Sequence, residues 1–210
     1  TTKEECLKFA TMCRVNGSCN NIPESLGGST DFAIFVHSFA LLVPPSEHFA
    51  EHPEYYSLID GKRIAGDDVN WQLCLTNPDI VDIAVENIRK ILRANPDKKI
   101  VSISQNDNLN HCQCEKCLKA DEEEGSPVGT IIRFANKIAE KLEPEFPDVI
   151  FDILPYHYSR PISHLTKARH NVCVRICASA TCFAHPFEKC DDRSHATARP
   201  NGERTIFVED

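Results

Sequence analysis

The segment IVSISQNDNLNHCQCEKCLKADEEEGSPVG, residues 100–129, passes from a strand through a polar loop to a helix start. Its first residues are β-branched and apolar, which is typical of a buried strand. Ser126 and Pro127 stand in the Ncap and N1 positions that commonly begin a helix. In α/β folds, ligands bind beyond the carboxyl ends of the strands. The polar loop between these two elements is therefore the expected functional region.

The alternation of strand and helix patterns continues on both sides of this segment. We expect strands at residues 31–38, 99–104, 149–154 and 171–177, and helices after Thr2, after Asn77-Pro78 and over residues 128–142. The long segment after the first strand carries several turn dipeptides, so we expect a binding loop there. Strands that alternate with helices form βαβ units, which predicts a parallel sheet.

The predicted strands end in polar or aromatic residues, as at the catalytic face of a (β/α)8 TIM-type barrel. A full barrel needs about 250 residues, whereas this chain has 210. We therefore predict an α/β fold, a partial (β/α)8 barrel in one domain over residues 1–210, with a poorly defined tail at 191–210. Remaining barrel strands and an upstream domain would belong to a longer parent protein. The expected functional face consists of loops 37–63, 105–126, 155–164 and 177–187.

Composition argues against several classes of partner. The hydrophobic fraction of 41% is enough for a folded core. The net charge of −8 argues against nucleic acid, because phosphate contacts need clustered Lys and Arg. No apolar run approaches the roughly 18–20 residues that span a bilayer, and no signal segment follows Thr1. We expect neither nucleic acid nor membrane insertion, and any targeting signal would lie upstream.

Two acidic positions are candidates for catalysis. Asp107 follows a strand end between Asn106 and Asn108, where its carboxyl could act as an acid or orient a substrate group. An Asx turn that merely ends the strand explains the same residues. Glu124 closes the acidic run 121–124 before a helix, where the helix dipole favours anions. It could supply a second carboxylate, although a solvated acidic helix start is the ordinary alternative.

Aromatic and histidine side chains near strand ends are candidates for substrate binding. These residues are His37, Tyr55, Tyr156, His157 and Tyr158, to which Asn108 is added from the polar loop. Aromatic rings can form a platform for sugars, but packing that seals the top of a barrel would use the same residues. A strand-end histidine such as His37 is more often a hydrogen-bonded structural residue.

A cluster of soft ligands stands in the same polar loop: His111, Cys112, Cys114 and Cys117. Zinc is bound tetrahedrally by such ligands, so a structural zinc is one interpretation. Disulfides or buried thiols are the alternatives, and the total of eleven cysteines is odd. One remote ligand, such as Cys74, Cys177 or Cys182, would complete a metal site. A metal, or disulfides to Cys177 or Cys182, would brace a loop otherwise too long to hold a catalytic carboxyl.

Several segments together resemble a known family. They are HSFALLVPP (37–45), EHPEYYSLIDGKR (51–63), QLCLTNPDI (72–80), SQNDN, HCQCEKC, EEEGSP and IIRFANKIAEKL (104–142), DILPYHY (152–158) and NVCVRICASATCFAHPF (171–187). Over roughly residues 5–190 their order is similar to that of the bacterial domain of unknown function 4838. Members of that domain group have been placed in glycoside hydrolase family 163. They also carry an upstream β domain and barrel strands that this sequence does not contain.

The resemblance implies a barrel glycosidase, an endo-β-N-acetylglucosaminidase acting on N-glycans outside the cytoplasm: secreted, periplasmic or at the cell surface. It implies retention by substrate assistance, in which the sugar's 2-acetamido oxygen is the nucleophile and no cofactor is required. Asn106-Asp107 is our first choice for the catalytic pair and Glu124 the second. Two other functions fit the sequence: a non-catalytic carbohydrate-binding barrel using Tyr55, Tyr156 and Tyr158, and a purely structural metal-binding module.

Overall fold

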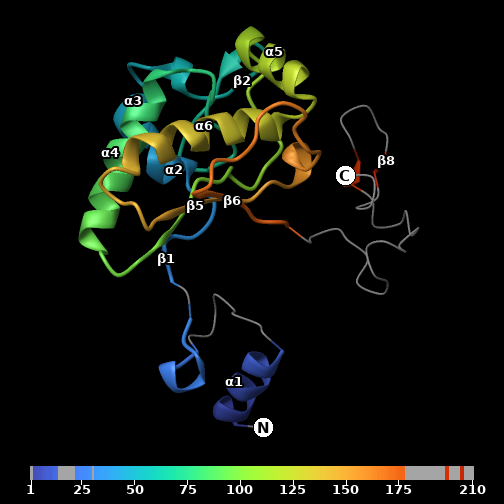
Figure 1. Cartoon of the computed structure of the whole chain (residues 1–210). Helices are drawn as coiled ribbons and strands as arrows, with labels where there is room; N and C mark the ends of the chain where they lie inside the picture. The colour runs from blue at the N-terminus through green and yellow to red at the C-terminus, as the bar shows by residue number, and fades with distance from the viewer. Residues whose placement is uncertain (1, 14–21, 30, 178–196, 199–203, 206–210) are drawn as a thin grey trace.

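The computed structural model describes residues 2–13, 22–29, 31–177, 197–198 and 204–205. Its centre is a sheet of four parallel strands in the order β1-β4-β5-β6 (Figure 1). The strands are β1 (Phe32–Ile34), β4 (Ile100–Ser102), β5 (Ile150–Ile153) and β6 (Val172–Val174). The parallel α/β fold predicted from the sequence is confirmed, because all three pairings are parallel.

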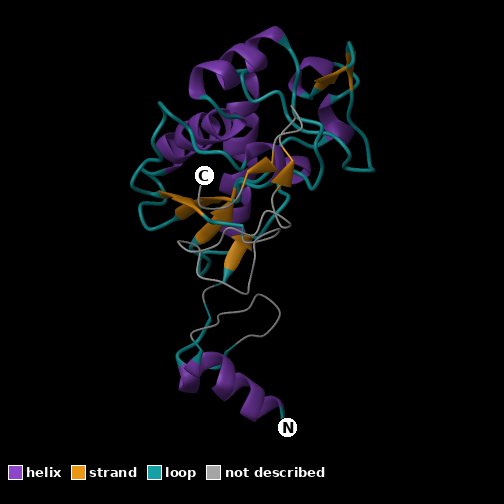
Figure 2. Ribbon diagram, turned by 90° about the vertical axis from the view of Figure 1, so that its right-hand side faces the viewer, coloured by secondary structure: helices purple, strands orange, loops and turns teal. Residues whose placement is uncertain are grey.

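Helices cover one face of this sheet (Figures 1 and 2). The two long helices are α4 (Asp79–Ala94) and α6 (Pro127–Leu142), and they contact each other. Their apolar residues recur every three or four positions, so they lie along one side of each helix and enter the core. Ser126 caps α6 as predicted, since its side chain accepts a hydrogen bond from the Val128 N–H.

The other face of the sheet carries an ion pair in which the carboxylate is buried and the guanidinium is partly exposed. The Asp152 carboxylate on β5 accepts hydrogen bonds from Ser102 Oγ at 2.9 Å and from Arg175 Nε and Nη2 at 3.0 and 2.7 Å. The Arg175 guanidinium also lies over the rings of Phe32 and Phe35, at 5.2 and 5.1 Å from their centroids. A buried carboxylate needs such partners. Ser102 and Arg175 are these partners, so the charge of Asp152 on this face of the sheet is paired.

The long segment after the first strand, predicted as a binding loop, contains short elements that the sequence did not indicate. It holds α2 (Phe39–Leu42), α3 (Pro45–His48), a 3-10 turn (Pro53–Tyr55) and the hairpin of β2 (Leu58–Ile59) with β3 (Lys62–Arg63). Elements of one turn or two residues are too short to produce a readable hydrophobic period.

The segment 105–126 was expected to lack secondary structure, and this expectation was wrong. Helix α5 spans Glu115–Glu124 and ends at Gly125, which adopts a left-handed conformation with φ of 73°. Its buried positions are Cys117, Ala120 and Glu124, none of them a large apolar residue. The helical period was therefore invisible, and Gly125 was the stop signal that the sequence offered.

The first helix is α1 (Lys3–Met12), which begins after Thr2 as predicted, and Thr2 forms a capping box with Glu5. It lies apart from the sheet in Figures 1 and 2, and none of its residues is buried. A 3-10 turn at Glu24–Leu26 follows. Within the predicted tail at 191–210, β7 (Thr197–Ala198) pairs antiparallel with β8 (Arg204–Thr205), and the rest of that tail lies outside the described residues.

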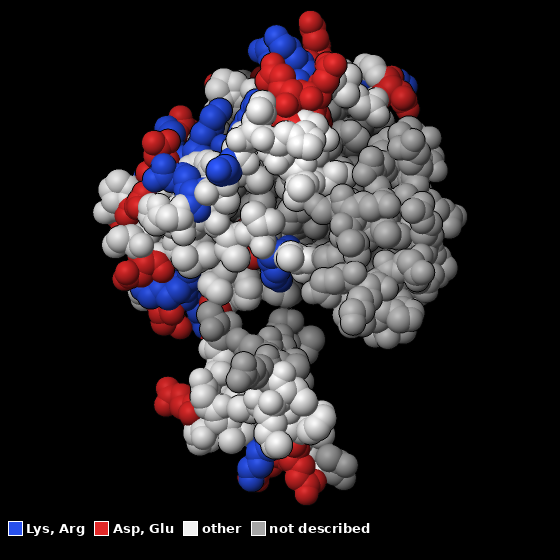
Figure 3. All heavy atoms as spheres, turned by 45° about the vertical axis from the view of Figure 1, so that its right-hand side comes forward, with Lys and Arg blue, Asp and Glu red and all other residues white. Residues whose placement is uncertain are grey.

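Charges on the helical layer are mixed. On the face shown in Figure 3, basic side chains are interspersed with acidic ones over the described residues. Arg89 pairs with Glu145 at 2.8 Å and Lys141 pairs with Asp82 at 2.7 Å. Among the helices that the structure describes, none has both the length and the apolarity needed to cross a membrane.

Candidate functional site

The carboxyl ends of β1, β4 and β5 bring four of the predicted site residues together. Asp107 Oδ1 accepts a hydrogen bond from the Tyr156 hydroxyl at 2.6 Å and lies 3.8 Å from His157 Nε2. The Tyr156 ring lies 4.6 Å from the His157 ring and 6.1 Å from the His37 ring, centroid to centroid. We call Asp107, Tyr156, His157 and His37 the strand-end group. It occupies the edge of the sheet where α/β proteins bind ligands.

The backbone of the strand-end group is held in an unusual conformation. His37 and His157 both have positive φ, at 53° and 54°, which residues other than glycine rarely adopt. The His37 N–H donates to Ser104 Oγ at 3.0 Å, and His37 Nδ1 lies 2.9 Å from the Gln105 carbonyl oxygen. Such conformations cost about 1–3 kcal/mol each and cluster at functional sites. The packing therefore holds both imidazoles in place against local strain.

Asp107 is exposed, whereas the residue before it is buried. Its side chain is 66% exposed, whereas Asn106 is 1% exposed and donates from Nδ2 to the Trp71 carbonyl at 2.8 Å. The Gln72 amide joins both neighbours of Asp107, donating to the Asn106 carbonyl at 2.8 Å and to Asn108 Oδ1 at 3.0 Å. Gln72 Oε1 accepts the Asn106 N–H at 2.9 Å. This clamp by Gln72 was not anticipated, because no local pattern marks Gln72.

The other two tyrosines proposed as sugar contacts stack on different histidines. The Tyr158 ring lies 4.7 Å from that of His111, and the Tyr55 ring lies 4.7 Å from that of His52. Burial raises the pKa of both phenols. His111 therefore packs against Tyr158, although the sequence grouped it with the cysteines as a soft ligand.

Glu124 is fully buried, in the last turn of α5. Its carboxylate accepts hydrogen bonds from Ser163 Oγ at 2.5 Å, from the Thr166 N–H at 3.0 Å and from Thr166 Oγ1 at 2.5 Å. Arg133 Nε lies 2.5 Å from Oε1. Burial alone would raise the pKa of Glu124, but these hydrogen bonds and the Arg133 charge lower it to about 2. Both carboxylate oxygens thus hold internal contacts.

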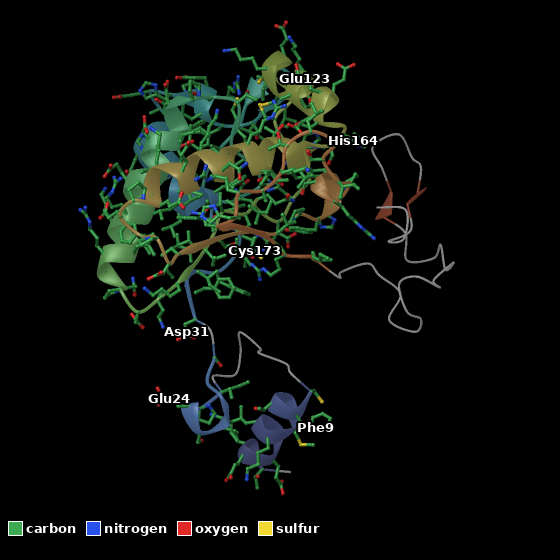
Figure 4. The ribbon with its side chains drawn as sticks, viewed as in Figure 1. Phe9, Glu24, Asp31, Glu123, His164 and Cys173 are labelled. Atoms are coloured by element: carbon green, nitrogen blue, oxygen red, sulfur yellow. The ribbon has the colours of Figure 1, made fainter. Side chains whose placement is uncertain are left out.

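Glu124 connects α5 to the segment after β5. The His164 N–H donates to the Glu124 carbonyl at 2.8 Å, so backbone and side chain both bind residues 163–166. In Figure 4 the two connected segments can be found by their labelled residues: Glu123, which precedes Glu124 in α5, and His164. We call this arrangement the Glu124 lock.

We predict that Gly129→Ala destabilises the protein by about 1–3 kcal/mol, the usual effect of overpacking. Alanine in place of an interior helix glycine normally stabilises by about 1 kcal/mol. A Cβ at Gly129, however, would overlap the side chain of Glu124. The free energy of unfolding from urea titration gives the sign. Lys137→Ala, at an exposed position of the same helix, is the control, and a stabilised Gly129→Ala would contradict the packing described.

Four cysteines converge beside α5. Cys74, Cys112, Cys114 and Cys117 place their Sγ atoms within 4.8 Å of one another. Cys74 Sγ lies 3.7 Å from Cys114 Sγ and 3.8 Å from Cys117 Sγ, and all four are free thiols. Of the remote cysteines considered from the sequence, Cys74 is the one in the cluster, and Cys182 lies outside the described residues. This four-cysteine cluster could hold a metal ion.

The surroundings of the cluster stabilise negative charge on sulfur. The Leu58 N–H and Arg63 Nη1 donate to Cys112 Sγ at 3.4 and 3.5 Å. Hydrogen bonds from the Cys112 and Cys117 thiols lower the pKa of Cys74 far below its usual range. Cys114 is the Ncap of α5, where the helix dipole favours anions. A thiolate, the form in which cysteine binds metals, is therefore favoured at Cys74. Hydrogen bonds with Cys112 and Cys74 raise the pKa of Cys117, so that thiol keeps its proton while the site holds no metal.

A parallel α/β domain with an exposed carboxylate at its strand ends and four clustered cysteines is a candidate ligand-binding or catalytic domain with a candidate metal centre. The chain belongs to the DUF4838 family, a domain of unknown function, whose family model matches residues 2–200. This match confirms the resemblance to the domain of unknown function 4838. No curated protein and no solved structure matches the chain.

Proposed function

We propose that this chain is part of a glycoside hydrolase, an endo-β-N-acetylglucosaminidase that acts on N-glycans outside the cytoplasm. The observation that carries the proposal is the Asp107 carboxylate, exposed at the strand ends and hydrogen bonded by Tyr156. The resemblance to glycoside hydrolase family 163 supports it. In this proposal the four strands are part of a (β/α)8 barrel, and the remaining strands belong to a longer protein.

The proposed reaction is substrate-assisted hydrolysis with retention. The 2-acetamido oxygen attacks the anomeric carbon while the bond to the leaving oxygen breaks, and that oxygen takes a proton from an acid. Water then opens the resulting oxazolinium ring. A carboxylate that accepts a hydrogen bond from the acetamide N–H makes the acetamide oxygen a better nucleophile. It also stabilises the positive charge that develops on the ring.

We assign the acetamide-orienting role to Asp107. The acid must donate a proton, whereas the orienting group must be ionised. Burial and the Asp107 charge raise the pKa of Tyr156, so its hydroxyl keeps the proton and donates to Asp107. Asp107 Oδ1 is thus the acceptor of a hydrogen bond, which is the role that the acetamide N–H requires of its partner. The geometry therefore suits orientation better than proton donation.

The proposed chemistry requires no cofactor, because the nucleophile belongs to the substrate. A metal bound by the four-cysteine cluster would be structural, since four thiolates leave no open coordination position for substrate.

The decisive test is product analysis by mass spectrometry on an N-glycoprotein treated with the full-length protein. We expect each released oligosaccharide to leave one N-acetylglucosamine on its asparagine. Conversion of that asparagine to aspartate would show an amidase and contradict the proposal. Glycan binding without release would instead favour the non-catalytic carbohydrate-binding function.

Tyr156→Phe is expected to lower kcat by about 10–100-fold, because a hydrogen bond to a charged group contributes about 1.5–3 kcal/mol. The hydroxyl acts through Asp107 and makes Tyr156 a positioning residue, so KM should change less than kcat. Steady-state kinetics on a defined N-glycopeptide separates the two constants. A rise in KM of about the same factor, with kcat unchanged, would assign Tyr156 to substrate binding instead.

A further inference from the structure

We propose that Cys74, Cys112, Cys114 and Cys117 bind one zinc ion as a tetrathiolate site. Zinc–sulfur bonds are about 2.3 Å, so the sulfurs of a regular tetrahedral site lie about 3.8 Å apart. The Cys74 Sγ atom lies 3.7 and 3.8 Å from those of Cys114 and Cys117, and all four atoms are within 4.8 Å of one another. The sulfurs thus nearly occupy the corners of such a site.

Hydrogen-bond donors around the sulfurs match the charge of this site. Zinc with four thiolates carries a net charge of −2, and a partly buried dianion needs donors in its outer shell. The Leu58 N–H and the Arg63 guanidinium point at Cys112 Sγ, and Thr76 Oγ1 lies 3.1 Å from Cys117 Sγ. Neutral thiols would not require a cation. A single disulfide would leave two of the four sulfurs without a role.

The geometry and the ligand type both select a structural ion. Tetrahedral all-sulfur sites hold zinc or iron, and zinc takes this arrangement without redox chemistry. The ion also has a route of entry. Cys74 and Cys114 line a cavity of about 440 Å³ together with Arg63, Asp79 and Lys116, so one side of the cluster meets solvent.

The zinc would fix both ends of the loop that carries Asp107. At one end Gln72 binds Asn106 and Asn108, and Gln72 stands two positions before Cys74. At the other end, Cys112 and the start of α5 would share the ion with Cys74. The loop and the Cys74 segment would then form one rigid unit. Zinc would keep Asp107 in its position and would take no part in the reaction.

The test is a metal titration of the reduced full chain after removal of bound metal. We expect one Co²⁺ per chain, with sulfur-to-cobalt charge-transfer bands and the intense visible bands of tetrahedral cobalt, and displacement by Zn²⁺. Cys74→Ser should weaken binding at least about tenfold. Cys173→Ser should leave it unchanged, because Cys173 is exposed on β6, away from the helices (Figure 4). Three results would overturn the proposal: a cobalt spectrum typical of six-coordinate Co²⁺, iron in place of zinc in the protein as purified, or unchanged metal affinity in Cys74→Ser.

Alkylation mapping keeps the test decisive if Cys74→Ser fails to fold. One equivalent of Zn²⁺ should protect the four cluster thiols out of the chain's eleven. Protection of a different set, or a disulfide between Cys74 and Cys114 in the protein as purified, before reduction, would contradict the site. Neither measurement depends on glycosidase activity, so the metal site and the proposed function can fail separately.

Discussion

Replacing Asp107 by asparagine is expected to lower kcat on an N-glycan by about 100-fold or more, the range found when one group that stabilises a transition state is lost. The substitution keeps the size of the side chain and removes its charge. The acetamide oxygen then becomes a weaker nucleophile, and the oxazolinium loses its counter-charge. Kinetics of the full-length protein on a defined N-glycopeptide measures the effect.

A second substrate distinguishes the two roles available to Asp107. An aryl glycoside of N-acetylglucosamine linked to an acidic phenol needs little help from an acid. If Asp107 orients the acetamide, the variant should lose as much activity on this substrate as on the glycan. Recovery on the aryl substrate would show that Asp107 is the acid. The matched control is Asp148→Asn, which changes an exposed aspartate just before the amino end of β5. Equal rates for the two variants would show that Asp107 has no part in catalysis.

Glu124→Gln is expected to destabilise the protein by about 3 kcal/mol at neutral pH. The pKa of Glu124 falls from an ordinary value of 4.5 to about 2 in the folded protein, and each unit corresponds to about 1.4 kcal/mol. Glutamine cannot supply the charge that Arg133 and the donors from Ser163 and Thr166 require. Urea unfolding at pH 7 measures the loss.

The same shift predicts how stability depends on pH. A carboxyl with a lowered pKa contributes stability above its unfolded value and loses it as protons bind the folded state. The contribution of Glu124 should therefore be complete above about pH 5 and decline as the pH falls from about 4.5 to about 2. Glu124→Gln should lack this part of the acid dependence, whereas Glu122→Gln at an exposed neighbouring position should keep it. Identical curves for both variants would contradict the Glu124 lock.

The parallel sheet could be predicted because each long helix has a hydrophobic period and each central strand is a short, mostly apolar run rich in β-branched residues. The helical stripe from Val81 to Leu92 and the cap at Ser126 are local signals, and the structure follows them. Helix α5 could not be predicted in this way. Its buried face contains a thiol, a methyl group and a carboxylate, and Glu124 is buried only because Arg133 and residues 163–166 surround it.

The site could be predicted in part for a similar reason. The rule that parallel strands end at one edge was enough to group Asp107 with Tyr156, His157 and His37. The fourth cysteine could not be chosen, because Cys74, Cys177 and Cys182 are all remote from the cysteine-rich segment in the sequence. The choice of Cys74 depends on the hydrogen bonds that bring residues 71–74 beside the Asp107 loop. Those bonds come from Gln72 and Asn106, and no spacing rule connects them.

The position of the four-cysteine cluster in the chain has a consequence for folding. Cys74 and Cys117 are 43 positions apart, and the chain between them contains α4 and β4. An ion that joins them would close a loop of that length, which removes about 4 kcal/mol of configurational entropy from the unfolded chain in a cross-link model. Metal affinity and folding free energy are then linked. The ion would bind tightly only after α4 has packed and β4 has entered the sheet, so metal retention would report on whether the chain has reached its native topology.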